Sequence, residues 1–190
     1  MSDDERPSFG TAPQDEPVTR RELERALPGF AVELLDADDY PDETGETFYE
    51  NALGKARYGR SLGPVDAWML GEDSGLEVDA LAGGPGVKTA RWADGRHVSR
   101  ILEALAGVED RRARYVCELV ALDPAGQELR GAGTLEGRIA YEARGAAGFG
   151  FDPVFVPDGE EHTVAELGDG WKSEHSHRAR AAAVLLRQIG

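Results

Sequence analysis

The sequence has little of what secreted, membrane-spanning or nucleic-acid-binding proteins use. It contains one cysteine, Cys117, so no disulfide can form within the chain, and we expect a reduced, cytoplasmic setting. No apolar run approaches the roughly 20 residues that a membrane-spanning helix requires. Lysine and arginine together number 21 against 36 acidic residues, a net charge of −15 at pH 7, which argues against binding to the nucleic-acid backbone. These absences indicate a protein whose partners include neither membrane nor nucleic acid.

What is present suits one folded domain that follows a polar tail. The chain has 190 residues, 41% of them hydrophobic, which is enough to form a substantial core. Residues 1–18 are rich in Asp, Glu, Pro and Ser and have few apolar side chains to bury. We therefore expect a disordered acidic tail over residues 1–18 and a single domain over residues 19–190.

Capping patterns and apolar spacing predict helices and strands that do not alternate strictly. Thr19 and Thr47 each begin a capping box, with Glu22 and Glu50 three residues later, and so mark two helix starts. The other predicted elements are strands at Ala31–Leu35, Ala67–Leu70, Gly75–Val78, Arg114–Leu122, Glu128–Leu135 and Phe151–Val156, and helices at His97–Ala106 and from Ser176 onward. This order predicts an α/β fold, with a mixed sheet flanked by helices.

The stretch Ala67–Arg91 carries the residues best suited to chemistry. A short apolar run leads into Gly71-Glu72-Asp73-Ser74-Gly75, which we interpret as a turn at a strand end, with two carboxylates and a hydroxyl between glycines. A strand end of an α/β sheet commonly holds a cation or a phosphate. The Gly83-Gly84-Pro85-Gly86 loop that follows has almost no side chains and lets another group approach closely. An acidic turn beside a Gly/Pro loop with no function is the alternative for this segment taken alone.

The same stretch, EDSGLEVDALAGGPGVKTAR, resembles the signature of the Ham1 family, also called the inosine triphosphate pyrophosphatase family. Three further motifs match: ETGETFYENALGKAR at Glu43–Arg57, GFGFDPVF at Gly148–Phe155 and WKSEHSHRARA at Trp171–Ala181. The resemblance implies an elongated mixed β-sheet flanked by helices, a homodimer, and an enzyme that uses Mg²⁺. It also implies hydrolysis of non-canonical purine nucleotides (ITP or dITP, and XTP) to the monophosphate and pyrophosphate.

The resemblance also implies roles for particular residues. Glu43 and Asp73 match the metal-binding acids, and Asp73 also matches the catalytic proton acceptor. Ser74 and Lys55 are expected to contact phosphate oxygens. The residues expected to bind the nucleotide and its base are Phe149, Gly150, Phe151, Asp152, Lys172, His177 and Arg178. Among these we expect Phe149 to stack on the purine and one phenylalanine of the motif to be a core residue, while His177 and Arg178 are our candidates for donors to the 6-oxo group.

One motif of the family is missing near the N-terminus. Members usually have an apolar strand there, followed by a Thr/Ser-x-Asn-x-x-Lys loop that binds phosphates through its amides and lysine. The residues Phe9–Gln14 have neither the Asn nor the Lys, and we expect the strand to be missing as well. The missing loop favours an alternative to the leading hypothesis, a nucleotide-binding protein of the same fold with impaired catalysis. A third alternative is a related pyrophosphatase with another base preference, because such enzymes share the fold. Retention of Glu43 and Asp73 favours an active enzyme.

Overall fold

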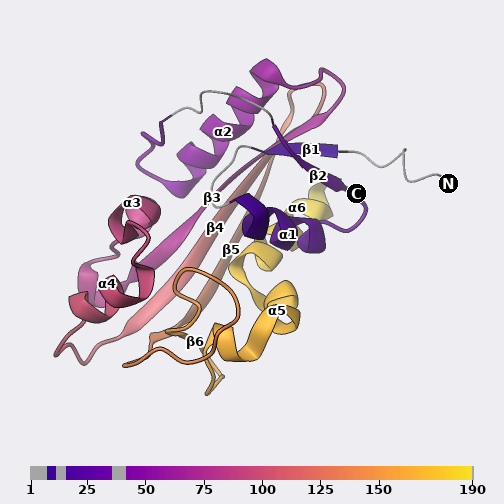
Figure 1. The fold of residues 1–190 in the computed structure, drawn as a ribbon. Coiled ribbons are helices and arrows are strands. Elements are labelled where there is room, and N and C mark those ends of the chain that lie inside the picture. Colours follow the sequence, from indigo (N-terminus) through magenta and orange to yellow (C-terminus); the bar gives the residue numbers. More distant parts are fainter. Residues whose placement is uncertain (1–7, 12–15, 36–41, 190) are drawn as a thin grey trace. The chain divides into compact units, whose positions relative to one another are not determined.

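The computed structural model describes residues 8–11, 16–35 and 42–189, and in them six strands form one mixed sheet in the order β2-β1-β3-β4-β5-β6 (Figure 1). The strands are β1 (Ser8–Thr11), β2 (Ala31–Leu34), β3 (Trp68–Val78), β4 (Arg112–Leu122), β5 (Glu128–Ile139) and β6 (Phe155–Pro157). The helices are α1 (Glu16–Ala26), α2 (Phe48–Leu62), α3 (Thr89–Ala93), α4 (His97–Ala104), α5 (Val164–His175) and α6 (His177–Ile189), with short 3₁₀ turns at Asp79–Leu81 and Gly86–Lys88. The predicted α/β class is confirmed.

Strand β1 corrects the expectation that the N-terminal strand is missing. Ser8–Thr11 pairs in parallel with β2 on one side and with β3 on the other (Figure 1). Ladder hydrogen bonds join backbone groups, so two neighbouring strands can order a segment whose own side chains give little strand signal. Helix α1 also begins at Glu16 rather than at Thr19. The predicted tail is therefore wrong for these segments, and residues 1–7 and 12–15 lie outside the described part of the chain.

Strand β3 corrects the interpretation of Gly71–Gly75 as a turn. The two predicted strands are one continuous strand of 11 residues, and the acidic residues lie in its interior. The reason is the packing of helix α2: a Cβ atom at Gly71 would collide with the carbonyl oxygen of Ala52 and lie 2.7 Å from the backbone nitrogen of Ala56. Gly71 thus permits the close approach of a helix and does not serve a turn.

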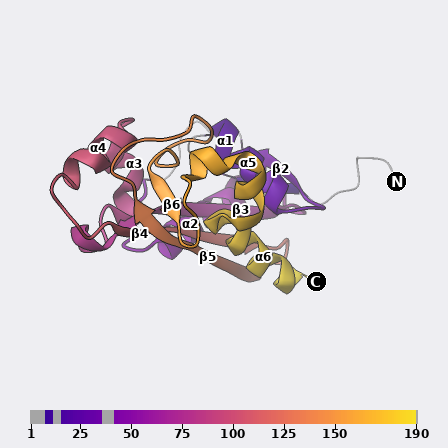
Figure 2. The ribbon, with the colours of Figure 1, turned by 90° about the horizontal axis from the view of Figure 1, so that it is seen from below.

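The described residues group into two compact units, and strands β3, β4 and β5 contribute to both. The first unit contains the chain up to Asp73, Cys117–Gly133 and the end from Arg178. Alternation along β4 directs Cys117, Leu119 and Ala121 toward the helices α1 and α6, while Val120 and Leu122 face α2. Helix α1 packs beside β2 in this unit (Figure 2). The capping box predicted at Thr47 is confirmed at the start of α2.

The second unit contains Ser74–Val116 and Thr134–His177. Its core includes Ile101 and Leu105 of the α4 segment, packed with Phe155 and other apolar residues. Strand β6 is shorter than predicted because residues 151–154 form a hydrogen-bonded turn before it, and α5, which was not predicted, lies beside it (Figure 2). Among the described residues no helix is long and apolar enough to cross a membrane. The single domain over residues 19–190 stays a prediction.

Candidate active site

The first candidate group is built around Asp73, a carboxylate on β3 that is only 5% exposed. Helix α2 presents Asn51 and Lys55, which are four residues apart and so share one face. The Asn51 side-chain amide donates to Oδ2 of Asp73 at 3.1 Å, and Lys55 Nζ donates to Oδ1 at 3.0 Å. Lys55 Nζ also donates to the backbone oxygen of Glu72 at 2.9 Å and forms an ion pair with Glu43 Oε1 at 2.6 Å. Two carboxylates therefore share one buried cation.

Burial and charge oppose each other at Asp73. Burial raises the pKa of this carboxyl from 3.8 to about 6, while the charge of Lys55 and the hydrogen bonds from Lys55 and Asn51 work to lower it. Burial works to lower the pKa of Lys55, but the charges of Asp73, Glu72 and Glu43 outweigh it and raise the pKa overall. Asp73 thus has the proton affinity that a general base needs near neutral pH.

The oxygen donors of this group fit a small divalent cation. Glu43 and Asp73 both lie within ion-pair distance of Lys55 Nζ, so their oxygens already converge on one positive charge. Mg²⁺ prefers one or two carboxylates, with water and phosphate oxygens completing its shell. Within residues 8–11, 16–35 and 42–189, no cluster of three or more His, Cys, Asp or Glu side chains is arranged to hold a metal. Glu43 and Asp73 are therefore the two carboxylates of this group that could hold such a cation.

Arg178 belongs to the same unit as Asp73 and pairs with two acids there. Its Nε donates to Oε1 of Glu72 at 3.0 Å, and its Nη1 donates to Oε2 of Glu22 at 3.1 Å. The Arg178 side chain is 8% exposed. Arg178 was predicted to lie with His177 at the base, and Glu22 was not predicted as a site residue. Its position three residues after Thr19 suggested only a helix cap.

The second candidate group surrounds Asp152, which is 2% exposed. Its Oδ2 accepts hydrogen bonds from Lys172 Nζ at 2.7 Å and from the backbone nitrogen of Phe149 at 2.9 Å. Lys172 Nζ lies 4.0 Å from the centre of the Phe149 ring, a cation–π contact. Gly148 has φ +75°, and a Cβ there would collide with Asp152 Oδ2, so the turn requires glycine at this position.

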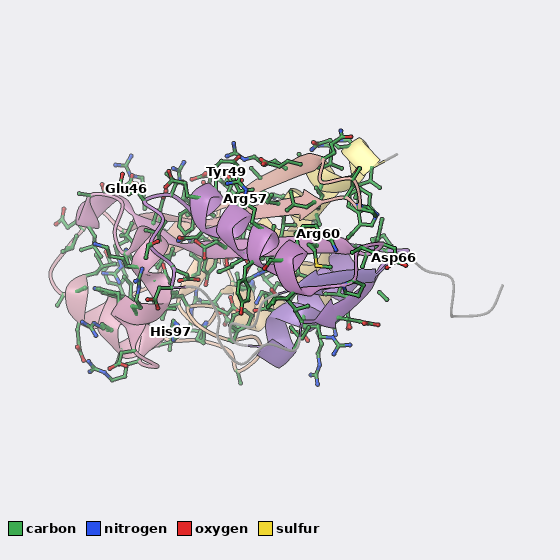
Figure 3. The ribbon with its side chains drawn as sticks, turned by 90° about the horizontal axis from the view of Figure 1, so that it is seen from above. Glu46, Tyr49, Arg57, Arg60, Asp66 and His97 are labelled. Carbon is green, nitrogen blue, oxygen red and sulfur yellow. The ribbon has the colours of Figure 1, made fainter. Side chains whose placement is uncertain are left out.

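The two phenylalanines of this turn have different surroundings. Phe151 is 3% exposed and packs against Trp92 and His97. His97, labelled in Figure 3, is the first residue of α4. Phe149 is only partly buried. Phe151 therefore supports the turn from within the core, and Phe149 is the more exposed of the two rings. Of the other predicted residues, Gly150 continues the turn with φ +62°, and Ser74 follows Asp73 on β3 and is partly buried.

Tyr115 joins the second group, although the sequence analysis did not select it. Its hydroxyl donates to Oδ1 of Asp152 at 3.3 Å, and its ring stacks on His177 with centroids 4.7 Å apart and an interplanar angle of 14°. Nothing in the sequence marks this residue, because a tyrosine in an apolar strand is ordinarily a packing residue.

The fold and these groups together define the class: an α/β enzyme that acts on nucleotides, with a buried acid–lysine group and an aromatic–lysine group. Residues 19–188 match the model of the Ham1 family, and the chain belongs to that family. It is 45% identical over 168 residues to a dITP/XTP pyrophosphatase of Opitutus terrae, a match that covers 82% of each chain. It is also 45% identical over 178 residues to a dITP/XTP pyrophosphatase of Symbiobacterium thermophilum, with 89% of this chain and 88% of the relative covered.

A solved structure agrees with the fold. The Ham1 protein of Staphylococcus aureus superimposes with a TM-score of 0.82 at 31% identity, over 96% of this chain and 97% of that one. The Ham1 protein of Coxiella burnetii also gives 0.82, at 30% identity. The family resemblance stated from the motifs is therefore confirmed, together with the fold that it implied.

Proposed function

We propose that the protein is a Mg²⁺-dependent nucleoside triphosphate pyrophosphohydrolase that acts on dITP, ITP and XTP and releases the monophosphate and pyrophosphate. The observation that carries this proposal is the Asp73 group, in which a buried carboxylate is held by Asn51 and Lys55 beside a second acid, Glu43. The similarity to the dITP/XTP pyrophosphatases of O. terrae and S. thermophilum supports it.

In this proposal Asp73 takes the proton of the attacking water. Its pKa of about 6 leaves most of the carboxylate ionised at neutral pH and still basic enough to receive a proton. Asn51 donates to one oxygen of Asp73 and so fixes its orientation. Lys55 stabilises the charge of the carboxylate and is long enough to turn toward a phosphate oxygen. Glu43 and Asp73 would hold Mg²⁺, which when bound neutralises charge on the phosphates.

The group around Asp152 would bind the base. A purine can stack on Phe149, an interaction that contributes roughly 1–3 kcal/mol. Hypoxanthine and xanthine carry a 6-oxo acceptor where adenine carries an amino donor. A protein donor held rigidly at that edge would face another donor in adenine. Because neither buried donor would then have an acceptor, the pocket would strongly prefer the 6-oxo bases. Lys172, held by Asp152, and His177 are the candidate donors.

Pyrophosphate release from dITP, XTP and dATP, each with Mg²⁺ and with EDTA, tests the proposal. We expect Mg²⁺-dependent release of one pyrophosphate for each monophosphate, faster with dITP and XTP than with dATP. Release of single phosphates, or turnover in EDTA, would contradict it.

The second candidate is a nucleotide-binding protein with impaired catalysis. It is favoured by the segment between β1 and α1, where residues 12–15 contain neither the Asn nor the Lys of the family loop. Calorimetric binding of dITP by a protein that releases no pyrophosphate would support this reading. A homodimer and a cytoplasmic location stay predictions from the resemblance and from the single cysteine, and light scattering at twice the 20.5 kDa chain mass checks the first.

A further inference from the structure

The residues proposed to bind the base come from three separate segments and need a common support. Asp152 lies in a turn, Lys172 on α5, and His177 begins α6. None of the three is on a strand. Tyr115, by contrast, lies on β4, a strand of 11 residues, and is 7% exposed.

Tyr115 contacts two of these residues through different parts of its side chain. The hydroxyl donates to Oδ1 of Asp152, while Lys172 and the Phe149 backbone donate to Oδ2. The ring stacks nearly parallel on the His177 imidazole and also packs against Phe155, with centroids 4.4 Å apart. The hydroxyl therefore restrains rotation of the Asp152 carboxylate, and the ring restrains the plane of His177.

A buried tyrosine hydroxyl needs a partner, and an apolar residue would fill this core position without that requirement. Ala113, two residues earlier on the same strand, faces the same core with no polar group. Packing alone therefore does not require the hydroxyl of Tyr115. This hydroxyl donates a hydrogen bond to Asp152.

We propose that Tyr115 is a positioning residue for base selection: it fixes the Asp152 carboxylate and the His177 ring relative to each other from a rigid strand. This inference rests on the proposed function. With the hydroxyl removed, Oδ1 of Asp152 loses this hydrogen bond while Oδ2 stays held by Lys172 and the Phe149 backbone, so the carboxylate is less firmly oriented and the pocket accepts a mismatched amino group at lower cost. The effect falls on discrimination between bases and leaves the hydrolytic group of Asp73, Asn51 and Lys55 intact.

The test measures kcat and KM for dITP and dATP in Tyr115→Phe and Tyr115→Leu. Phe keeps the ring and loses the hydroxyl, so the ratio of kcat/KM values for dITP and dATP should fall roughly two- to tenfold, with kcat for dITP within about twofold of the wild type. Leu also loses the stacking on His177, and the ratio should fall further. Tyr141→Phe is the matched control, because Tyr141 is 76% exposed in the same unit and should leave the ratio unchanged.

A role in packing alone predicts a different pattern. Both substrates would then lose the same factor in kcat/KM, the melting temperature would fall, and the ratio would stay at the wild-type value, which overturns the proposal. The ratio of the dissociation constants of dAMP and dIMP, measured by calorimetry, reports the discrimination between bases without turnover. A wild-type protein that discriminates in binding but hydrolyses nothing contradicts the proposed activity and still tests Tyr115. A wild type that shows no preference in either assay overturns both proposals.

Discussion

Single residues in the Asp73 group balance desolvation against charge. Asp73 and Lys55 are both buried. Lys55 and Asn51 favour the ionised form of Asp73, and Asp73 and Glu43 favour the charged form of Lys55. A buried pair of this kind contributes little net stability, because the cost of removing both charges from water offsets their attraction. Its retention in the core is therefore better explained by chemistry than by folding.

Replacing Asp73 with Asn tests that explanation. The amide keeps the shape of the carboxylate but has neither its charge nor its basicity, so turnover of dITP should fall at least about a thousandfold, on the scale of losing a general base and a metal ligand together. The circular dichroism spectrum should be unchanged. A folded Asp73→Asn protein with near-wild-type release of pyrophosphate would remove Asp73 from the mechanism.

The raised pKa of Asp73 also predicts how stability depends on pH in the absence of Mg²⁺. The pKa is about 6 in the folded protein and 3.8 in the unfolded chain, so between these values the folded state holds the extra proton. Stability from this group is therefore full below about pH 4 and is lost as the pH rises to about 6, by up to roughly 3 kcal/mol.

Urea unfolding from pH 4 to 7 of the wild type and of Asp73→Asn measures this effect. The free energy of unfolding of the wild type, relative to the variant, should decline across this window and then level off. Added Mg²⁺ should stabilise the wild type more above pH 6 than below it, because the metal binds the ionised carboxylate. A difference between the two proteins that does not change with pH would refute the assignment.

At the scale of elements, the contact of α2 with β3 places Asn51 and Lys55 over Asp73. Gly71 allows this contact, and Arg60 fixes the connection that follows the helix by donating to the backbone oxygen of Ala67 at 2.6 Å. Figure 3 labels Arg60 near the end of α2 and Asp66 in that connection. The site therefore depends on a close approach of the helix and strand backbones.

Gly71→Ala should separate α2 from β3. Its Cβ would meet backbone atoms of Ala52 and Ala56, which cannot rotate away, so we expect a loss of about 3 kcal/mol or more in unfolding free energy, together with lost activity. Gly54→Ala, on helix α2, is the matched control. Nothing lies within 4 Å of its added Cβ, and helix propensity should give a gain of about 0.5–1 kcal/mol. Equal effects at both positions would contradict this account of the packing.

The spacing between β1 and α1 allows the missing phosphate loop to be rebuilt. Strand β1 ends at Thr11 and α1 begins at Glu16, so Pro13→Asn with Glu16→Lys would create the family's Thr-x-Asn-x-x-Lys pattern. Each charge-assisted hydrogen bond to a polyphosphate contributes about 1.5–3 kcal/mol. One such bond should lower KM for dITP by roughly ten- to a hundredfold.

Pro13→Asn with Glu16→Gln is the control for this loop, since it removes the acid without adding an amine. This control should lower KM for dITP only by the part that comes from removing the repulsion between Glu16 and the phosphates. If the Lys and Gln versions lower KM equally, the loop lysine makes no contact with phosphate, and substrate binding depends on other cations such as Lys55.

At the scale of the whole molecule, a net charge of −15 opposes both compactness and the capture of a polyanion. Salt screens exposed charges over about 10 Å at 0.1 M. We therefore expect the melting temperature to rise by a few degrees between 10 mM and 300 mM NaCl at pH 7. At a pH close to the isoelectric point of about 4.6 the rise should disappear. A melting temperature that falls with salt at pH 7 would show that attractive ion pairs outweigh the repulsion.

The local patterns of the sequence determined most of the elements and the family. The capping box at Thr47 begins α2 as predicted, because a cap depends on residues only three positions apart. The apolar spacing of residues 97–106 likewise predicted α4. The runs around Asp73, Asp152 and His177-Arg178 predicted candidate site residues because each is a contiguous run whose residue types suit a metal, a base or an anion, and the roles of these residues stay predictions.

Only the tertiary structure decided how distant segments combine. The sequence suggested a turn at Gly71–Gly75, and the approach of α2 made it the middle of a strand. The sequence also predicted no strand at Ser8–Thr11, but this segment forms a strand because it pairs with β2 and β3. Arg178 lies 156 residues from its partner Glu22, and Tyr115 lies 37 from Asp152. Such contacts follow from packing, and a single sequence carries no local signal for them.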